Sequence, residues 1–377
     1  MVETDRDLLL ESVVLGHRDR RLAQIGEKVL GERRLTPEDA LYLFERADLT
    51  YLGLLADYKN RKINGNLAYF VVNVQINPTN VCIYGCRFCA FAVKGRNHPR
   101  AYELSTEEIL AKVGELYALG GREVHLVGGI PPHWRYEDYL NLLRAIKERY
   151  PEVILKAYTA IEVHHMAKLA KKSVKEVLRD LKEAGLAVLP GGGAEIFNEE
   201  KRRVIAPHKA SAEEYLKVHR AAHELGIPTN ITMLYGHVES YADRVEHMTK
   251  VRELQDQTGG FQVFIPLKYR PKGTELGGEE ASPVEDLKTV AIARLFLDNF
   301  KHVKAYWVTL GERIAQLALS YGADDLDGTI LEEKIVHAAG TEAALGHAKE
   351  KLVSLIREAG KVPAERDTFY RVLRVYS

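Results

Sequence analysis

Residues 67–91 have the sequence LAYFVVNVQINPTNVCIYGCRFCAF. The first part, residues 67–76, is almost continuously apolar and rich in β-branched and aromatic side chains, a pattern typical of a buried strand. The part that follows contains all three cysteines of the chain, Cys82, Cys86 and Cys89, in the spacing C-x3-C-x2-C. A buried strand that leads directly into a cluster of thiols predicts that chemistry takes place at the end of this strand.

From residue 67 onward, short apolar runs alternate with longer amphipathic segments. Capping boxes at Ser105 and Ser211 and a Ser-Pro pair at residues 282–283 indicate where helices begin. Eight strands that alternate with helices predict an α/β fold, a (β/α) TIM-type barrel that is complete or partly open, with a doubly wound sheet as the alternative. The expected strands are residues 67–76, 123–127, 153–158, 187–189, 229–234, 261–267, 303–308 and a weaker one near 321–326.

The barrel is expected to occupy only the middle of the chain. Residues 1–66 are expected to form a helical N-terminal extension, in which Thr36 and Pro37 start one helix. The barrel itself would span residues 67–329, and residues 330–377 would form a C-terminal helical segment packed on it.

Composition limits the classes of function. The chain has 53 Lys and Arg and 53 Asp and Glu, a balance that does not indicate a nucleic-acid or membrane-surface partner. Residues 1–21 are charged throughout and lack the apolar core of a signal peptide, and no apolar run approaches the roughly 20 residues that span a bilayer. An odd number of clustered cysteines argues against disulfides. We therefore expect a cytoplasmic protein.

The thiol cluster is better suited to iron and sulfur than to zinc. Each iron of a four-iron cluster needs a ligand, so three thiolates leave one iron open to a substrate or cofactor. A structural zinc site usually combines two separated Cys/His pairs, and here it would need His125 or His237 for completion. A non-catalytic iron–sulfur or zinc-binding protein is the alternative of another class, although a carrier does not need so long a βα body.

Other unusual residues follow the predicted strands. Because the C-terminal ends of barrel strands share one mouth, we expect the active site there. These residues are Gly128 and Gly129 after the second strand, Glu162 after the third, Gly191, Gly192, Gly193 and Glu195 after the fourth, His237 after the fifth, Lys268 and Arg270 after the sixth, and an acidic turn at 324–327 near the eighth.

The cysteine spacing, with an aromatic residue before the last cysteine, resembles that of the radical S-adenosylmethionine (SAM) superfamily. The resemblance implies one 4Fe-4S cluster held by the three cysteines, with its fourth iron open to SAM, and reductive cleavage of SAM to a 5′-deoxyadenosyl radical. Ile130 stands where the superfamily typically has an acid, so backbone carbonyls or Glu162 would take that contact. The resemblance implies that Phe88, Gly128, Gly129, Glu162 and Glu195 bind the cofactors.

Longer stretches resemble one branch of this superfamily, the radical enzymes of the futalosine route to menaquinone and the related deazaflavin-cofactor synthases. The likeness extends over roughly residues 35–370 and is carried by residues 77–91, 189–197, 229–239 and 324–329. It implies addition of the radical to 3-[(1-carboxyvinyl)oxy]benzoate, with aryl migration and decarboxylation, to form 6-amino-6-deoxyfutalosine. Cyclisation of dehypoxanthine futalosine and assembly of a deazaflavin cofactor are the alternatives within the branch.

This reaction implies definite partners. SAM would be a consumed co-substrate, the second substrate a small aromatic enol ether dicarboxylate, and the reductant a low-potential donor such as flavodoxin or ferredoxin. A buried carboxylate requires a cation, and Arg202, Arg270 and Lys268 are the candidates. No catalytic residue is assigned beyond the cluster. The substrate site that the resemblance implies comprises Gly191, Gly192, Gly193, Arg202, His237 and Arg270.

Overall fold

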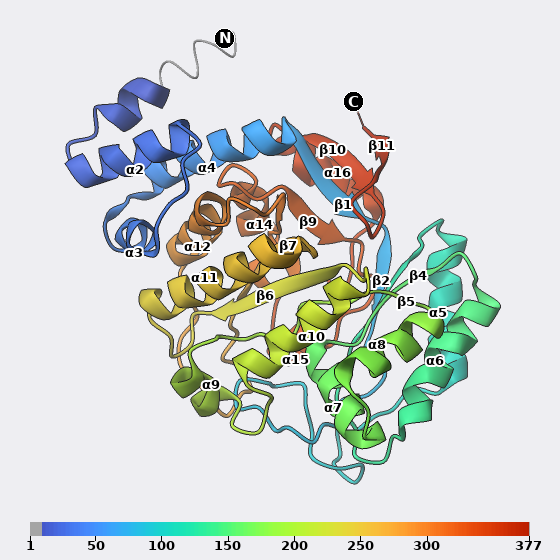
Figure 1. Cartoon of the computed structure of the whole chain (residues 1–377). Helices are drawn as coiled ribbons and strands as arrows, with labels where there is room; N and C mark the ends of the chain where they lie inside the picture. Colours follow the sequence, from blue (N-terminus) through green and yellow to red (C-terminus); the bar gives the residue numbers. More distant parts are fainter. Residues whose placement is uncertain (1–9, 377) are drawn as a thin grey trace.

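The computed structural model describes residues 10–376, and its centre is a ring of parallel strands surrounded by helices (Figure 1). The strands pair in the order of the sequence, and helices connect most of them, so the predicted (β/α) barrel is confirmed. The strands of the ring are β1 (Leu67–Val71), β2 (Asn73–Ile76), β3 (Glu123–Leu126), β4 (Ile154–Ala157), β5 (Leu186–Val188), β6 (Thr229–Tyr235), β7 (Phe261–Lys268), β8 (His302–Val303) and β9 (Asp325–Gly328).

The ring is closed. Parallel bridges join Leu189 to Thr229 and Lys304 to Asp325, which connects β5 to β6 and β8 to β9. Strand β9 then pairs with β1, with which the ring began. The sequence had left open whether the barrel is complete, and this pairing answers the question.

Three strands differ from the expected ones. The run 67–76 is divided at Val72 into β1 and β2, because its first half pairs with β9 and its second half with β3. The expected strand 303–308 is replaced by the two-residue strand β8, which begins one residue earlier, and Trp307–Leu310 forms a short helix. The last strand begins and ends later than residues 321–326. Short apolar runs do not distinguish a buried strand from a buried helix, which explains the second difference.

The helices begin where the capping signals predicted. Ser105 and Ser211 form capping boxes, Ser282 caps the helix that starts at Pro283, and Thr36 caps the helix that starts at Pro37. The helices up to the end of the barrel are α2 (Arg20–Leu30), α3 (Pro37–Arg46), α4 (Leu49–Asn64), α5 (Thr106–Ala118), α6 (Tyr136–Arg149), α7 (Ala160–Ala170), α8 (Val174–Glu183), α9 (Glu199–Ile205), α10 (Ala212–Glu224), α11 (Tyr241–Thr258), α12 (Pro283–Phe296), α13 (Trp307–Leu310) and α14 (Glu312–Ala318).

The C-terminal segment is not purely helical, which corrects the expectation for residues 330–377. It contains α15 (Ile335–Ala338) and α16 (Lys349–Glu358), followed by β10 (Val362–Arg366), which pairs parallel to β1, and β11 (Val372–Val375), which pairs antiparallel to β10. Figure 1 shows these two strands in red beside the blue β1. Pro363, Glu365 and Arg366 break the apolar pattern of a strand, so β10 could not be recognised. The division of the chain into three parts stays a prediction.

The two faces of the ring differ in polarity. Alternate residues of a strand point to opposite faces. In β3, Val124 and Leu126 belong to the apolar core outside the ring, whereas His125 lines a cavity inside it and Glu123 meets buried cations. The interior of this barrel is therefore polar and charged.

Among the described residues we find no helix that combines the length and the apolar character needed to cross a membrane. The cytoplasmic location stays a prediction.

Candidate active site

A cavity of about 310 Å³ lies at the C-terminal ends of the strands and reaches into the barrel. Its wall contains most of the residues that the sequence singled out. Those residues are Cys82, Cys86, Phe88, Cys89, Gly128, Gly129, Glu162, Gly191, Gly192, Gly193, Glu195, Lys268 and Arg270.

The thiols lie on the long loop between β2 and α5, which is tied down by backbone hydrogen bonds. The amide of Cys82 donates to the Val93 carbonyl (3.0 Å), and the amide of Arg87 donates to the Ile205 carbonyl (2.8 Å). Asn80 adds a side-chain bond to the Arg100 carbonyl (2.8 Å). The loop that carries the thiols is thus anchored at both of its halves.

The three thiols are partly buried, and the cation Lys209 lies near them. Burial raises the pKa of Cys86 to about 12 and also raises that of Cys89, while Lys209 lowers both. A thiol must lose its proton to bind a metal, so Lys209 favours the liganding form.

The donor set fits a 4Fe-4S cluster. All three thiols line one cavity. Within residues 10–376, no three His, Cys, Asp or Glu side chains gather at a position for a single metal ion. Thiolates that each bind a different iron of one cluster do not need to meet at a point. Cys82, Cys86 and Cys89 would hold the cluster, and the rest of the cavity lies open beside them.

Lys209 pairs with a predicted site residue. Its ammonium group donates to Glu195 and lies 5.2 Å from the centre of the Phe88 ring. The side chains of Lys209 and Glu195 are only 11% and 7% exposed. Lys209 was not predicted, because it lies on the loop between α9 and α10, outside any strand end or motif.

Glu162 lies at the start of α7. Its carboxylate accepts a hydrogen bond from the amide of Thr159 (2.6 Å), and the Thr159 hydroxyl accepts one from the Glu162 amide (3.4 Å). Burial raises the pKa of Glu162 to about 7, against the opposing effect of these hydrogen bonds. Glu162 can therefore hold or accept a proton near neutral pH.

Two of the glycine positions are required by close packing. A Cβ atom on Gly129 would lie 2.3 Å from the Val81 carbonyl oxygen, and one on Gly128 would lie 2.9 Å from that of Thr79. The Gly129 amide also donates to the Thr79 carbonyl (2.7 Å). These glycines let the end of β3 pack directly against the loop that carries the thiols.

Lys268 and Arg270 form one side of the cavity and already have partners. Lys268 pairs with Asp286 (2.9 Å), and Arg270 pairs with Glu280 (2.7 Å). The guanidinium of Arg270 also donates twice to the Thr309 carbonyl, at 3.1 and 2.7 Å. Their charges are therefore largely balanced by the carboxylates of Asp286 and Glu280.

Arg202 and His237 do not line the cavity, which corrects two predicted substrate contacts. The guanidinium of Arg202 is buried and donates to backbone carbonyls, including those of Ala210 (2.7 Å) and Gly193 (3.1 Å). The His237 ring bonds to the Leu234 carbonyl (3.1 Å) and its side chain is fully buried. Arg202 holds loop carbonyls in place and His237 binds a carbonyl at the end of β6, since backbone carbonyls near a strand end also need donors.

The floor of the cavity is formed by polar and charged side chains of the strands. Gln75, His125 and Lys156 are register partners on three neighbouring strands, and all three line the cavity. Lys304 and Asp327 line it too and form an ion pair of 3.0 Å. This row of polar side chains takes the place of the branched apolar residues that usually fill a barrel.

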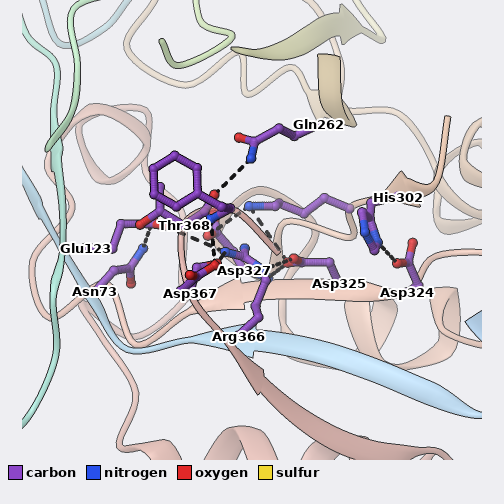
Figure 2. A network of polar contacts seen from close by, with 12 residues as sticks. Asn73, Glu123, Gln262, His302, Asp324, Asp325, Asp327, Arg366, Asp367 and Thr368 are labelled. Carbon is purple, nitrogen blue, oxygen red and sulfur yellow. Dashed lines mark hydrogen bonds and ion pairs between the residues drawn. The ribbon is translucent and has the colours of Figure 1, made fainter. Parts of the chain in front are cut away.

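A second group of charged side chains, Glu123, Asp325 and Arg366, pairs with the lysines of the floor and with one another (Figure 2). Glu123 forms ion pairs with Lys156 and, at 3.7 Å, with Arg366, which comes from β10. Arg366 also donates to Asp325 (2.7 Å), and Asn73 donates to Glu123 (3.2 Å). The acidic turn expected at 324–327 is thus mainly strand β9, and its carboxylates pair with cations of the protein.

The sequence contains a feature that indicates the floor residues, although the prediction of the site did not include them. Lys156 and Lys304 each interrupt an otherwise apolar run, VILKAY and HVKAY. A charge in a buried strand has to point into the barrel and find a partner there.

Comparison with known proteins identifies the family. Residues 76–251 match the family described as the radical SAM superfamily, and residues 258–377 match the CofH/MqnC C-terminal region. The chain is 48% identical to the aminodeoxyfutalosine synthase of Thermus thermophilus, over 96% of this chain and 98% of the relative. It is 43% identical to that of Streptomyces coelicolor, over 94% of each chain. The cyclic dehypoxanthine futalosine synthase of Streptomyces coelicolor is 40% identical, over 94% of this chain and 90% of the relative.

Solved structures agree at the level of the fold. The FeFe-hydrogenase maturase HydG from Carboxydothermus hydrogenoformans has a TM-score of 0.73 at 16% identity and covers 98% of this chain and 84% of its own. Methylornithine synthase (PylB) has a TM-score of 0.70 at 20% identity, with 90% and 97% covered. With its barrel, its three-thiol loop and these identities, the chain belongs to the radical SAM superfamily, in the group that includes the aminodeoxyfutalosine synthases.

Proposed function

We propose that this chain transfers the 5′-deoxyadenosyl group of SAM to 3-[(1-carboxyvinyl)oxy]benzoate and thereby forms 6-amino-6-deoxyfutalosine. The observation that carries the proposal is the 48% identity to an aminodeoxyfutalosine synthase across nearly the full length of both chains. The cyclic dehypoxanthine futalosine synthases reach 40% and 38%.

The overall conversion defines what the cavity must do. When bound, the cluster supplies the electron that cleaves SAM. The C5′ carbon forms a bond to the vinyl CH2 carbon, the aryl group moves from oxygen to the neighbouring carbon, and CO2 leaves. The electron that entered at SAM cleavage leaves again as the ketone product forms, so the conversion is redox-neutral. The site must hold two substrates in contact and keep water away from a radical.

The residues near the thiols suit the polar parts of SAM. Glu195 and Glu162 are buried carboxylates in the cavity wall and can accept hydrogen bonds from ribose hydroxyls or an ammonium group. Phe88 offers an aromatic face in the same region. We assign these three side chains to SAM.

The electron that cleaves SAM has to come from outside the chain. We propose a small low-potential donor such as flavodoxin or ferredoxin. The second substrate is a flat aromatic dicarboxylate, and the cations of the cavity are the groups that can balance its charge.

The experiment that tests the proposal follows the ribose carbons. The chain is reconstituted with iron and sulfide without oxygen and given ribose-labelled SAM, a reductant and the enol ether. We expect one labelled product with the mass of aminodeoxyfutalosine, together with CO2 and methionine. Free labelled 5′-deoxyadenosine in stoichiometric yield, without an adduct, would overturn the proposal.

The same assay separates the alternatives. With dehypoxanthine futalosine in place of the enol ether, a hydrogen abstraction would release free 5′-deoxyadenosine and a cyclised product. We expect no turnover of this compound.

A further inference from the structure

Two lysines inside the barrel have no role in the proposal so far. Lys156 comes from β4 and Lys304 follows β8, and their side chains are 4% and 1% exposed. Both line the cavity at its floor, below the ends of the strands where the thiol loop begins. Burying two ammonium groups there carries a desolvation penalty, which has to be offset by anionic partners.

The charges around these lysines are arranged in layers. The side chains of Lys156 and Lys304 line the cavity, whereas Glu123 and Asp325, with which they pair, do not. Arg366 lies with the carboxylates and pairs with both of them. Arg366 therefore offsets negative charge that the lysines would otherwise have to balance. The carboxylates that do line the cavity beside them, Asp327 and Glu333, pair with Lys304 and His337, so Lys156 is the floor cation whose carboxylate partner lies outside the cavity wall.

The two lysines differ in the number of carboxylates that they contact. Lys156 donates one hydrogen bond, to Glu123, and an ammonium group has three donors. Lys304 lies 3.0 Å from Asp327, which also lines the cavity, and 3.8 Å from Asp325. Lys156 is thus the better donor to a ligand, and Lys304 is the weaker one.

Neighbouring polar atoms of the floor also lack partners. His125 Nε2 and Asn230 Oδ1 are buried without a hydrogen bond, and both residues line the cavity. Burial, together with Lys156, lowers the pKa of His125 to about 3, so its ring is neutral. Unpartnered polar atoms beside a lysine with spare donors are the features of a site prepared for a polar ligand group.

The other cations of the cavity are less suited to this role. Lys209 pairs with Glu195 beside the thiols, at the end that we assign to SAM. Lys268 and Arg270 are held by Asp286 and Glu280.

We propose that Lys156, assisted by Lys304, binds the ring carboxylate of the aromatic substrate. This inference rests on the proposed function. The vinyl group has to face C5′ of SAM at the thiol end, and the carboxylate beside it leaves as CO2, so a permanent cation there would oppose its loss. The ring carboxylate lies at the other end of the flat molecule and enters the barrel. There it meets Lys156 and Lys304.

The test compares two ligands on the unreduced, cluster-containing chain, where no turnover takes place. One ligand is the enol ether diacid, and the other is 2-phenoxyacrylate, which lacks only the ring carboxylate. By calorimetry, we expect the wild type to bind 2-phenoxyacrylate about 10- to 100-fold more weakly, as for loss of a charge-assisted hydrogen bond. In Lys156→Met this preference should nearly disappear, and in Lys304→Met it should shrink by less.

A buried lysine outside the cavity provides the control. Lys361 pairs with Asp57 at 2.6 Å and is 7% exposed, and Lys361→Met should lose stability but keep the wild-type preference. A wild-type chain that binds both ligands equally would overturn the inference, whether or not the variants fold. A folded Lys156→Met that keeps the full preference would overturn it too. A wild-type chain that neither binds nor converts the diacid would instead overturn the proposed function.

Discussion

The two ends of the cavity are built in different ways. At the mouth, the thiols and Glu195 follow the strands on loops, Glu162 lies in the first turn of α7, and each belongs to a short contiguous motif. At the floor, single charged residues from separate strands meet inside the barrel, and Arg366 joins them from β10. The mouth suits a cluster and SAM, whereas the floor suits the anionic end of a second substrate.

The two ends also differ in how they depend on the rest of the fold. The thiol loop at the mouth is held by hydrogen bonds within the loop and by a backbone bond from Arg87 to the end of α9. At the floor, each buried charge is balanced by side chains from distant parts of the chain, and removal of one partner leaves an uncompensated charge. Changes at the mouth should therefore affect chemistry first, and changes at the floor should affect stability and substrate binding together.

The largest effect is expected from Cys86→Ala. Removing one of three thiolates removes a ligand of the cluster, so SAM cleavage should fall to background while the barrel stays folded. Iron content measures the cluster, release of methionine from SAM measures cleavage, and circular dichroism measures folding. A variant that keeps its iron and cleaves SAM would contradict the assignment of the mouth.

The next effect is expected from Arg366→Met. Glu123 and Asp325 would each lose a buried cationic partner, which should lower the free energy of unfolding by about 3–5 kcal/mol. Urea titration measures this free energy of unfolding. Arg371→Met is the matched control, because Arg371 is exposed on the same segment and its loss should cost less than about 1 kcal/mol. Equal losses in the two variants would show that Arg366 does not support the floor.

The free energy of unfolding should depend on pH through Glu162, which lies at the mouth of the cavity. Its folded-state pKa of about 7 lies above the ordinary value of 4.5, so the folded chain holds the proton more tightly. The resulting stabilisation is complete below about pH 4.5 and is lost as the pH rises through 7. Between pH 4.5 and 8, the cluster-free wild type should lose roughly 3 kcal/mol relative to Glu162→Gln. Parallel pH profiles of the two chains would contradict this.

The smallest effect is expected from His237→Gln. The ring binds a backbone carbonyl and lies outside the cavity, so the loss should be about 1 kcal/mol of stability. Affinities for SAM and the diacid should stay within about twofold, as for a change that removes no ligand contact. A tenfold loss for either ligand would restore His237 to the substrate site.

Much of the mouth could be predicted from the sequence. Strand ends share one face of a barrel, so residues such as Cys86, Gly129 and Glu195 could be placed together from their position after a strand. Position after a strand does not fix the direction of a side chain, however. Arg202 and His237 were predicted from that position, but they turn to backbone carbonyls outside the cavity.

The floor could not be predicted in the same way. Lys156 and Lys304 depend on strand register, and their layering depends on Arg366, which lies more than 200 residues from Lys156 along the chain. Arg366 sits in a strand without an apolar pattern, so neither β10 nor its role was visible. Long-range charge compensation is a property of the folded barrel and has no local sequence pattern.

The division between mouth and floor can be measured directly on the unreduced, cluster-containing chain. The dissociation constants of SAM and of the enol ether diacid are determined for the wild type, Glu195→Gln and Lys156→Met. The account predicts a crossed pattern, in which Glu195→Gln weakens SAM about tenfold or more and Lys156→Met does the same to the diacid, each with little effect on the other ligand. If Lys156→Met weakened both ligands equally, or weakened only SAM, the account of two separate ends would be wrong.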